Sequence, residues 1–218
     1  MDFATARRAM VSNQLRPAGV VDEALLAAMG SIPRESFVPK ALRSVAYLAD
    51  DLALAEGRVL MAPLVTALLF QTAAIRPTDL VLEIGSGVGY GAAILSRLAN
   101  TVVALESDGG MAEQAGRAMA ALSIDNVAIV TGPLHMGYRP QAPFDAIIVS
   151  GAVDRVLDDL LTQLADGGRL VALVDNRGGM GRGTLFTRRE GAIGRREVFD
   201  AATAKLAEFE NPKGFVFA

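Results

Sequence analysis

Between residues 79 and 174, short apolar runs alternate with longer segments in which apolar residues recur at helical spacing. The short runs are typical of buried strands, and the longer segments are typical of amphipathic helices. The pattern predicts strands over 80–84, 101–106, 127–131, 144–149 and 168–174, and helices over about 89–99, 108–122 and 156–165. This alternation favours an α/β fold with a mainly parallel sheet that is covered on both faces.

The region before this alternation has a different character. Residues 3–15 and 22–29 carry apolar positions at helical spacing, and a turn with the sequence Arg-Pro-Ala-Gly at 16–19 separates them. The two prolines of 32–39 predict an extended segment. Residues 40–60 show no clean period, so they predict no regular element. The chain therefore starts with a helical extension.

Two further elements flank the central pattern. Pro63 suits the first turn of a helix that runs from residue 63 to about residue 74. Towards the C-terminus, residues 176–183 are rich in glycine and predict a flexible connection. The segments 184–189 and 195–200 then bracket a turn over 190–194, which is typical of a β-hairpin. We expect this hairpin to close the sheet in antiparallel fashion.

Composition narrows the possible functions. The chain has 218 residues, of which 51% are hydrophobic, and its net charge of −3 gives no electrostatic reason to bind nucleic acid or an anionic membrane. It shows no apolar run of the roughly 20 residues that span a bilayer, and no secretory signal. The absence of cysteine excludes thiolate sites and fits a cytoplasmic protein. A single histidine argues against a zinc site or a Ser-His-Asp triad, so we expect no metal.

The stretch Val-Leu-Glu-Ile-Gly-Ser-Gly-Val-Gly at 81–89 carries the clearest chemical signal. An apolar strand contains a carboxylate, Glu83, near its end, and three glycines follow at alternate positions. Glycines permit a tight turn, after which the free N–H groups at the start of a helix face a ligand. A second carboxylate, Glu106, ends the next apolar strand, where it can accept hydrogen bonds from a ribose diol. These features predict a nucleoside-cofactor site.

Three interpretations of the glycine loop are open. A dinucleotide site has the spacing G-x-G-x-x-G, whereas this loop reads E-x-G-x-G-x-G with Ser86 inside it. That form resembles motif I of S-adenosylmethionine-dependent methyltransferases. A carboxylate such as Glu83 is favourable beside a sulfonium and an amino group, and unfavourable beside phosphates. The loop therefore favours S-adenosylmethionine over a nicotinamide cofactor, and over a structural turn that uses glycine only for its geometry.

Several segments together resemble the protein-L-isoaspartate O-methyltransferase family. They are the N-terminal stretch from 10 to 39, the glycine loop at 81–90, and the segments at 142–149 and 160–171. The resemblance covers most of residues 8–174, and its N-terminal part is specific to this family. It implies a Rossmann-like methyltransferase fold, S-adenosylmethionine as cofactor, and isoaspartyl residues of damaged proteins or peptides as substrates.

On this basis we expect one methyltransferase-like domain. Residues 1–62 would form the helical N-terminal extension and the substrate-side segment, 63–174 the cofactor-binding core, and 175–218 the C-terminal hairpin and tail. The expected fold class is α/β, doubly wound and mainly parallel. We expect no nucleic-acid, membrane or metal partner.

The resemblance also implies which residues form the site. The cofactor-binding set is Glu83, Gly85, Ser86, Gly87, Gly89, Glu106, Ser107, Pro133 and Leu134. The substrate-side set is Leu60, Met61, Ala62, Pro63 and Thr66. Met61 stands where the family carries its active-site serine, so no catalytic residue is identified. Pro133 stands where the family carries the aspartate that binds the adenine amino group, which predicts weaker cofactor binding.

The implied reaction requires little from the protein. An isoaspartyl carboxylate has a pKa of about 4 and is ionised at neutral pH, so no general base is needed. The protein has to hold this carboxylate against the methyl group and exclude water. Without the serine hydroxyl we expect slow turnover, unless Thr66 or a backbone N–H near Met61 takes its place.

Two other functions stay open at this stage. A methyltransferase with a different acceptor would keep the cofactor site and change the substrate side at Met61. A non-catalytic binding or regulatory protein would explain both departures, although the glycine loop and Glu106 are intact. His135 follows Pro133 and Leu134, in the loop that should border the adenine pocket, and is interpreted as a cofactor or substrate contact, as a base for a less acidic acceptor, or as a surface-loop residue.

Overall fold

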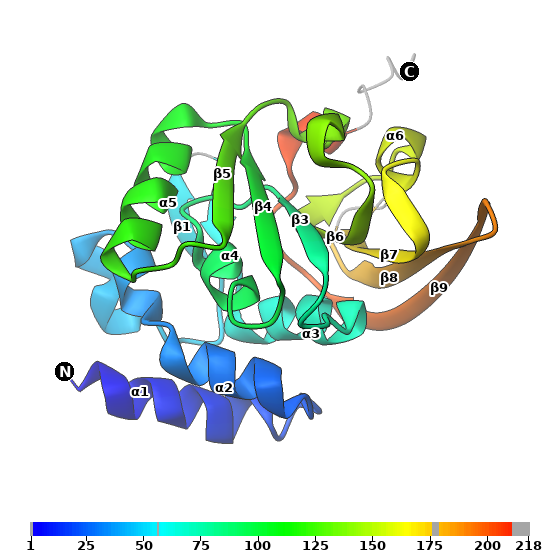
Figure 1. Ribbon diagram of the computed structural model, residues 1–218. Coiled ribbons are helices and arrows are strands. Elements are labelled where there is room, and N and C mark those ends of the chain that lie inside the picture. Colours follow the sequence, from blue (N-terminus) through cyan, green and yellow to red (C-terminus); the bar gives the residue numbers. More distant parts are fainter. Residues whose placement is uncertain (1, 56, 176–178, 211–218) are drawn as a thin grey trace, which may run out of the picture.

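A seven-stranded sheet forms the centre of the protein, which the computed structural model describes over residues 2–55, 57–175 and 179–210 (Figure 1). Its strand order is β5-β4-β3-β6-β7-β8-β9. The strands are β3 (Leu80–Ile84), β4 (Thr101–Glu106), β5 (Val127–Thr131), β6 (Phe144–Val153), β7 (Leu164–Val174), β8 (Gly181–Arg189) and β9 (Ala192–Ala201). The first five strands in this order, from β5 to β7, pair in parallel with their neighbours. Strand β8 then pairs antiparallel with β7, and β9 pairs antiparallel with β8 at the edge of the sheet. The mainly parallel α/β fold with a C-terminal hairpin is confirmed.

Both faces of the sheet are covered, which explains why its central strands are almost wholly apolar. The helices are α1 (Phe3–Met10), α2 (Glu23–Ser31), α3 (Pro63–Ala73), α4 (Tyr90–Leu95), α5 (Gly109–Ala121) and α6 (Asp158–Leu161). On β3, Val81 packs in the core that α1 to α4 share, whereas Leu82 packs on the opposite face with residues of α6. Successive side chains of this strand therefore pack into two separate hydrophobic cores, one on each face of the sheet.

Some elements end elsewhere than the pattern predicts. Strand β7 begins at Leu164, which pairs with Phe144 of β6. The helix predicted over 156–165 is therefore too long, because its last residues belong to the sheet. Helix α4 likewise ends at Leu95 rather than near residue 99. The strands predicted over 80–84, 101–106 and 127–131 match β3, β4 and β5 residue for residue.

The helices predicted in the N-terminal extension are present, and α1 continues as a π-helical turn over Val11–Leu15. Helix α2 packs against α3 and α4. The doubly wound fold predicts that these helices lie near the carboxyl ends of the strands and help to cover the site. The N-terminal residues that border the site come instead from the later segments 36–39 and 54–61.

The extended segment predicted over 32–39 is wrong in its centre. Residues Arg34–Phe37 form a 3-10 turn, in which the Ser36 N–H donates to the Pro33 carbonyl at 2.9 Å. The two prolines flank this turn rather than straighten it. The turn buries the side chain of Arg34, which is 0% exposed.

Residues 40–60, for which no regular element is predicted, contain a short 3-10 turn and a two-stranded antiparallel hairpin. The strands of this hairpin are β1 (Leu52–Ala55) and β2 (Arg58–Leu60), and they stand apart from the central sheet. Strands of four and three residues are too short to show a period of two. Asp51 fixes the base of the hairpin, because one carboxylate oxygen accepts the Ala62 N–H at 2.7 Å.

The C-terminal hairpin is confirmed, with a shorter turn than the predicted 190–194. Only Glu190 and Gly191 form it, with φ angles of 49° and 78°. Residues 181–183 of the predicted flexible connection belong to β8, and residues 176–178 lie outside the described residues. Gly183 has a structural reason to be glycine, since a Cβ there would lie 2.3 Å from the ring of Phe199.

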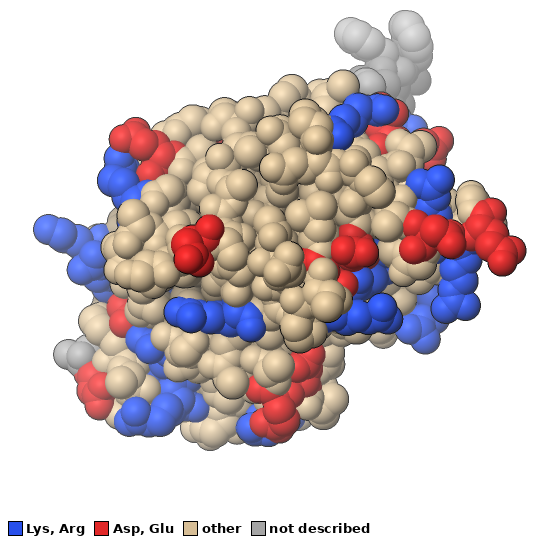
Figure 2. All heavy atoms as spheres, viewed as in Figure 1, with Lys and Arg blue, Asp and Glu red and all other residues tan. Residues whose placement is uncertain are grey.

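The surface mixes the two signs of charge. On the face shown in Figure 2, acidic and basic side chains lie along the edges and across the lower half, and a broad area without charged side chains lies in the upper middle. Exposed residues of opposite sign pair locally, as Arg16 does with Glu23 and Arg117 with Glu113. Over the described ranges, no helix has both the length and the apolar character to cross a membrane.

Candidate functional site

The loop between β3 and α4 contains three glycines with positive φ. The angles are 76° at Gly85, 56° at Gly87 and 90° at Gly89, a region that other residues rarely adopt. Gly89 also passes close to α5, because a Cβ there would lie 2.9 Å from the Cβ of Ala115. The structure therefore contains the tight turn that the spacing predicts, and the loop leads directly into α4.

The carboxylate of Glu106, fully buried at the end of β4, is the best-connected polar group of the site. Its Oε1 accepts the N–H groups of Ser107 at 2.9 Å and Asp108 at 3.0 Å, and its Oε2 accepts the Gly87 N–H at 2.7 Å. The guanidinium of Arg58 adds two parallel hydrogen bonds, each of 2.5 Å, one to each oxygen. Glu106 thus joins the glycine loop, the start of α5 and the β1–β2 hairpin.

Arg58 is a site residue that sequence reasoning missed. It lies on β2, 48 positions before Glu106, in the region where no element is predicted. The one signal available was its place three positions before Met61, at the start of the substrate-side segment. Nothing in that placement predicts a contact with the end of β4.

Glu83 is buried beneath the glycine loop. The Ser150 hydroxyl donates to its Oε1 at 2.6 Å, and its Oε2 finds no hydrogen-bond partner among the described residues. Burial raises the pKa of Glu83 to about 8, and the negative charge of Glu106 adds to the rise. The group is therefore mainly protonated at neutral pH.

Gly91 is also required by Glu83. A Cβ at Gly91 would lie 1.9 Å from Oε1 of the Glu83 carboxylate. Neither Gly91 nor Ser150 was among the predicted site residues. Gly91 could have been found, because it continues the alternate-glycine pattern of 85, 87 and 89 by one more step.

A small cavity of about 20 Å³ lies between the glycine loop and the hairpin. Three polar atoms of residues that line it, Ser86 Oγ, Tyr90 Oη and Glu83 Oε2, are buried and find no hydrogen-bond partner within the described part of the chain. Buried polar atoms in proteins normally have a partner, so an unpaired set beside a cavity indicates a polar ligand. Ser86 and Glu83 were predicted for this role, and Tyr90 was not.

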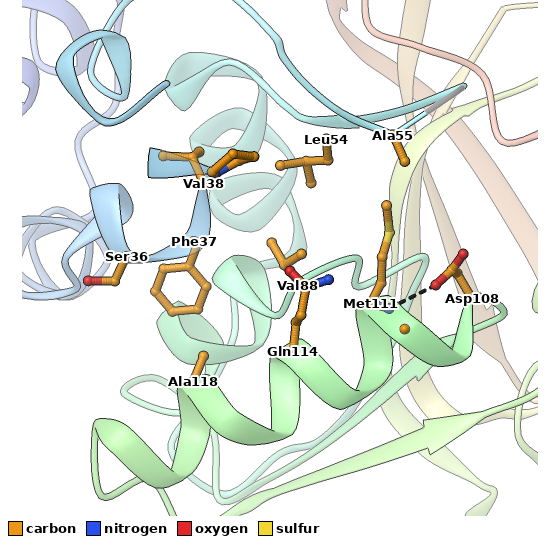
Figure 3. A pocket seen from close by; sticks show the side chains of 12 residues that line it. Ser36, Phe37, Val38, Leu54, Ala55, Val88, Asp108, Met111, Gln114 and Ala118 are labelled. Carbon is orange, nitrogen blue, oxygen red and sulfur yellow. Dashed lines mark hydrogen bonds between the residues drawn. The ribbon is translucent and has the colours of Figure 1, made fainter. Parts of the chain in front are cut away.

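A larger cavity of about 360 Å³ lies between segment 36–39, β1 and α5 (Figure 3). Figure 3 shows Leu54 and Ala55 of β1 above α5, and Phe37 at the other end of the space. Leu54 and Val88 line both cavities. These two side chains therefore lie between the larger cavity and the small one.

The predicted substrate-side residues are all buried, and three of them, Leu60, Met61 and Thr66, line the small cavity. The Thr66 hydroxyl donates to the Ala62 carbonyl at 3.3 Å, and the Ala62 N–H donates to Asp51. Both groups were possible substitutes for the missing serine hydroxyl. Because both are already engaged, neither is free to orient a substrate carboxylate in this conformation.

Arg34, a second residue missed from the sequence, fixes the backbone at Met61. Its Nη2 donates to the Met61 carbonyl and its Nε to the Ala46 carbonyl, each at 2.7 Å. The guanidinium carbon lies 4.9 Å from the centre of the Tyr90 ring. Complete burial lowers the pKa of Arg34 below its ordinary value. This buried cation connects the substrate-side segment to the first turn of α4.

The loop after β5 is held by the C-terminal segment. The Leu134 N–H donates to a carboxylate oxygen of Glu208 at 2.7 Å, and the same oxygen lies 3.2 Å from Nδ1 of His135. The His135 side chain is 45% exposed, which agrees with its interpretation as a surface-loop residue. Glu208 was not predicted, since it lies 74 positions from Leu134. It places a carboxylate beside the position of Pro133, where the sequence has none.

Fold and site together define the class of the protein. A Rossmann-like sheet with a glycine loop after one parallel strand and a buried acid after the next is the arrangement of a nucleoside-binding domain. In the described ranges, no group of three or more acidic or histidine side chains is placed to hold a metal ion. The protein is therefore a Rossmann-like α/β protein with a candidate nucleoside-cofactor site.

Comparison with known proteins gives the family. The sequence profile described as Protein-L-isoaspartate(D-aspartate) O-methyltransferase (PCMT) matches residues 6–200. A protein-L-isoaspartate O-methyltransferase from Methanoculleus marisnigri is 43% identical over 171 residues, which cover 78% of this chain and 78% of the relative. The chain belongs to the protein-L-isoaspartate (D-aspartate) O-methyltransferase family.

Solved structures agree with the fold. One protein-L-isoaspartate O-methyltransferase superposes with a TM-score of 0.81 and 27% identity, and the match covers 92% of this chain and 66% of that one. A Plasmodium falciparum protein assigned to the same class, in complex with S-adenosyl-L-homocysteine, gives a TM-score of 0.79 at 19% identity over 93% of this chain and 98% of that one. The second similarity is evidence for the fold alone.

Proposed function

We propose that this protein is an S-adenosylmethionine-dependent O-methyltransferase that methylates isoaspartyl carboxylates of damaged proteins or peptides. The observation that carries the proposal is the family match over residues 6–200, which includes both the glycine loop and the substrate-side segment. The two alternatives, a different acceptor and a non-catalytic homologue, are not favoured by relatives that all carry the same enzyme name. A cytoplasmic location, which the absence of cysteine supports, is part of the proposal.

The residues present fit the cofactor. The unpaired atoms Ser86 Oγ, Tyr90 Oη and Glu83 Oε2 lie beside a loop that has no side chains at its three positive-φ positions. When bound, the cofactor supplies a methyl group on a sulfonium, which needs no further activation. We assign the ribose hydroxyls to Glu106 and the base to the neighbourhood of Ser107 and Leu134.

The substrate side of this proposal rests on positioning. Leu60 and Met61 form an apolar wall that excludes water from the transfer site, which strengthens the electrostatic interactions inside it. The isoaspartyl carboxylate attacks in its ionised form, so the chain has to orient it and does not have to remove a proton. The Thr66 hydroxyl and the Ala62 N–H, the two groups that stand nearest in sequence to the missing serine, are both engaged within the protein, so we expect slow turnover.

Methyl transfer to an isoaspartyl peptide is the direct test. We expect the protein to bind S-adenosylhomocysteine in a calorimetric titration and to transfer methyl slowly to an isoaspartyl peptide. A peptide of the same sequence with a normal aspartate should stay unmethylated. In normal aspartate one CH₂ group separates the carboxylate from the main chain, whereas the free carboxylate of an isoaspartyl residue is bonded to the main chain directly. Cofactor binding without any methyl transfer would support the non-catalytic alternative, and methylation of another group would support a different acceptor.

Replacing Met61 with serine should raise activity. The substitution Met61→Ser restores a hydroxyl beside the attacking carboxylate, and we expect kcat/KM on the isoaspartyl peptide to rise about tenfold, the equivalent of roughly 1.4 kcal/mol for one hydrogen bond. Met61→Ala is the matched control, because it removes the same bulk without adding a donor. An equal rise in both variants would mean that space, and not the hydroxyl, limits the reaction.

A further inference from the structure

We infer that Arg58 is a latch that closes the ribose site, so that cofactor binding must break the Arg58–Glu106 ion pair and lift the β1–β2 hairpin. The inference rests on the proposed function, because it takes Glu106 as the acceptor of the ribose hydroxyls.

The carboxylate of Glu106 has no acceptor capacity left in this conformation. A carboxylate offers about four lone-pair positions. Here it receives five donors, namely two from Arg58 and one each from Gly87, Ser107 and Asp108. The three backbone donors belong to the loops that frame the site. Arg58 is therefore the one of these donors that can leave without rebuilding the fold.

The hairpin also occupies the space above the loop. A Cβ placed on Gly87 would lie 4.0 Å from Nη2 of Arg58 and 4.0 Å from Cδ1 of Leu54, so both hairpin side chains lie directly over this glycine. The remaining cavity is about 20 Å³. Sites for ligands of this size measure about 300–1,000 Å³. The conformation with Arg58 on Glu106 is closed to the cofactor.

Two sets of polar contacts hold the hairpin, one at its base and one on its far strand. It is a separate two-stranded sheet of short strands, a structure that is marginally stable by itself. Its base is clamped, because Asp51 accepts the Ala62 N–H at 2.7 Å with one oxygen and the Thr203 hydroxyl at 2.6 Å with the other. The bidentate pair with Glu106 is the charged contact that holds its far strand down.

Lifting the hairpin has a second consequence. Leu54 lines both the small cavity and the cavity of about 360 Å³, so lifting the hairpin takes away one of the two side chains that lie between them. A space within the size range of ligand sites would then extend to the glycine loop. Breaking one ion pair thus has two effects at once: it exposes the Glu106 carboxylate to the ribose, and it enlarges the site. The apparent dissociation constant of the cofactor equals its intrinsic value divided by the fraction of open molecules.

The test compares the affinity of the full chain for S-adenosylhomocysteine in four forms. We expect Arg58→Met to bind at least about tenfold more tightly than the unmodified protein. The gain should be in the association rate constant, because closed molecules slow the entry of the ligand and do not change the rate at which bound ligand leaves. Arg58→Lys should lie between the two, because lysine keeps the charge and cannot form the two-pronged contact. Titration calorimetry and stopped-flow binding measure both quantities, and thermal unfolding checks that each variant is folded.

Arg16→Met is the matched control. Arg16 makes a similar two-pronged contact with Glu23, at 2.5 and 2.7 Å, on the exposed surface. This variant should bind like the unmodified protein. Arg58→Met that is folded and binds no more tightly, or less tightly, would overturn the latch and show Arg58 to be neutral or a cofactor contact. Failure of every form to bind would overturn the proposed function and the latch with it.

A double variant shows that Glu106 is the shared target. In the Arg58→Met background no latch remains, so Glu106→Ala should weaken binding at least about tenfold, the factor for 1.4 kcal/mol. If Glu106→Ala has no effect there, Glu106 does not hold the ribose and Arg58 cannot compete for it.

Discussion

Replacing Gly91 with alanine is expected to lower the free energy of unfolding by about 2–4 kcal/mol, at the upper end of what overpacking costs. The added Cβ would lie 1.9 Å from Oε1 and 2.8 Å from Cδ of Glu83. Glu83 is 1% exposed and accepts the Ser150 hydroxyl, so its carboxyl group can move away only by losing that buried hydrogen bond. The carboxyl group would have to leave its position under the glycine loop. Urea unfolding measures the loss as a lower midpoint at unchanged slope.

The double variant Glu83→Ala with Gly91→Ala separates this contact from a general intolerance at α4. With the carboxyl group removed, alanine at position 91 should cost little, so the two substitutions should be strongly non-additive. Gly116→Ala is the control, since a Cβ at Gly116 in α5 would meet nothing within 4 Å. It should be neutral or slightly stabilising, because alanine is the better helix former. Additive losses in the double variant would contradict the predicted clash.

The stability of the protein should fall as the pH rises between about 4.5 and 8. Burial raises the pKa of Glu83 from its ordinary value of 4.5 to about 8 in the folded protein. In this window the folded protein holds a proton that the unfolded chain has lost, so each rise in pH favours unfolding. Each pKa unit corresponds to about 1.4 kcal/mol, which sets a ceiling of about 5 kcal/mol on the total loss. Above pH 8 this contribution has been lost completely.

Glu83→Gln tests this dependence, because an amide of the same shape carries no titratable proton. We expect the variant to gain stability relative to the unmodified protein as the pH is raised from 5 to 9, measured by urea unfolding at each pH. Glu113→Gln is the matched control on the exposed face of α5, where the side chain is 71% exposed. It should keep the pH slope of the unmodified protein. Parallel curves for Glu83→Gln and the unmodified protein would show that Glu83 is ionised in its buried position.

The amino-acid sequence by itself determined the central architecture. The apolar runs at β3, β4 and β5 and the glycines at 85, 87 and 89 act through local geometry, since a buried strand favours a continuous apolar run and a positive φ strongly favours glycine. These requirements depend only on residues that are adjacent in the sequence, so they can be recognised without knowledge of the tertiary structure. The same local logic placed Glu106 at the end of β4, one strand away from the loop.

The tertiary structure alone decided which charged groups meet. Arg58 and Glu106 are 48 positions apart, and Glu208 and Leu134 are 74 apart. Arg34 likewise reaches the Met61 carbonyl across 27 positions. These contacts depend on where separate segments pass one another after packing, and β1 and β2 are too short to leave a periodic trace. The sequence thus set the loop and the acid of the site, whereas chain packing decided that an arginine would cover that acid.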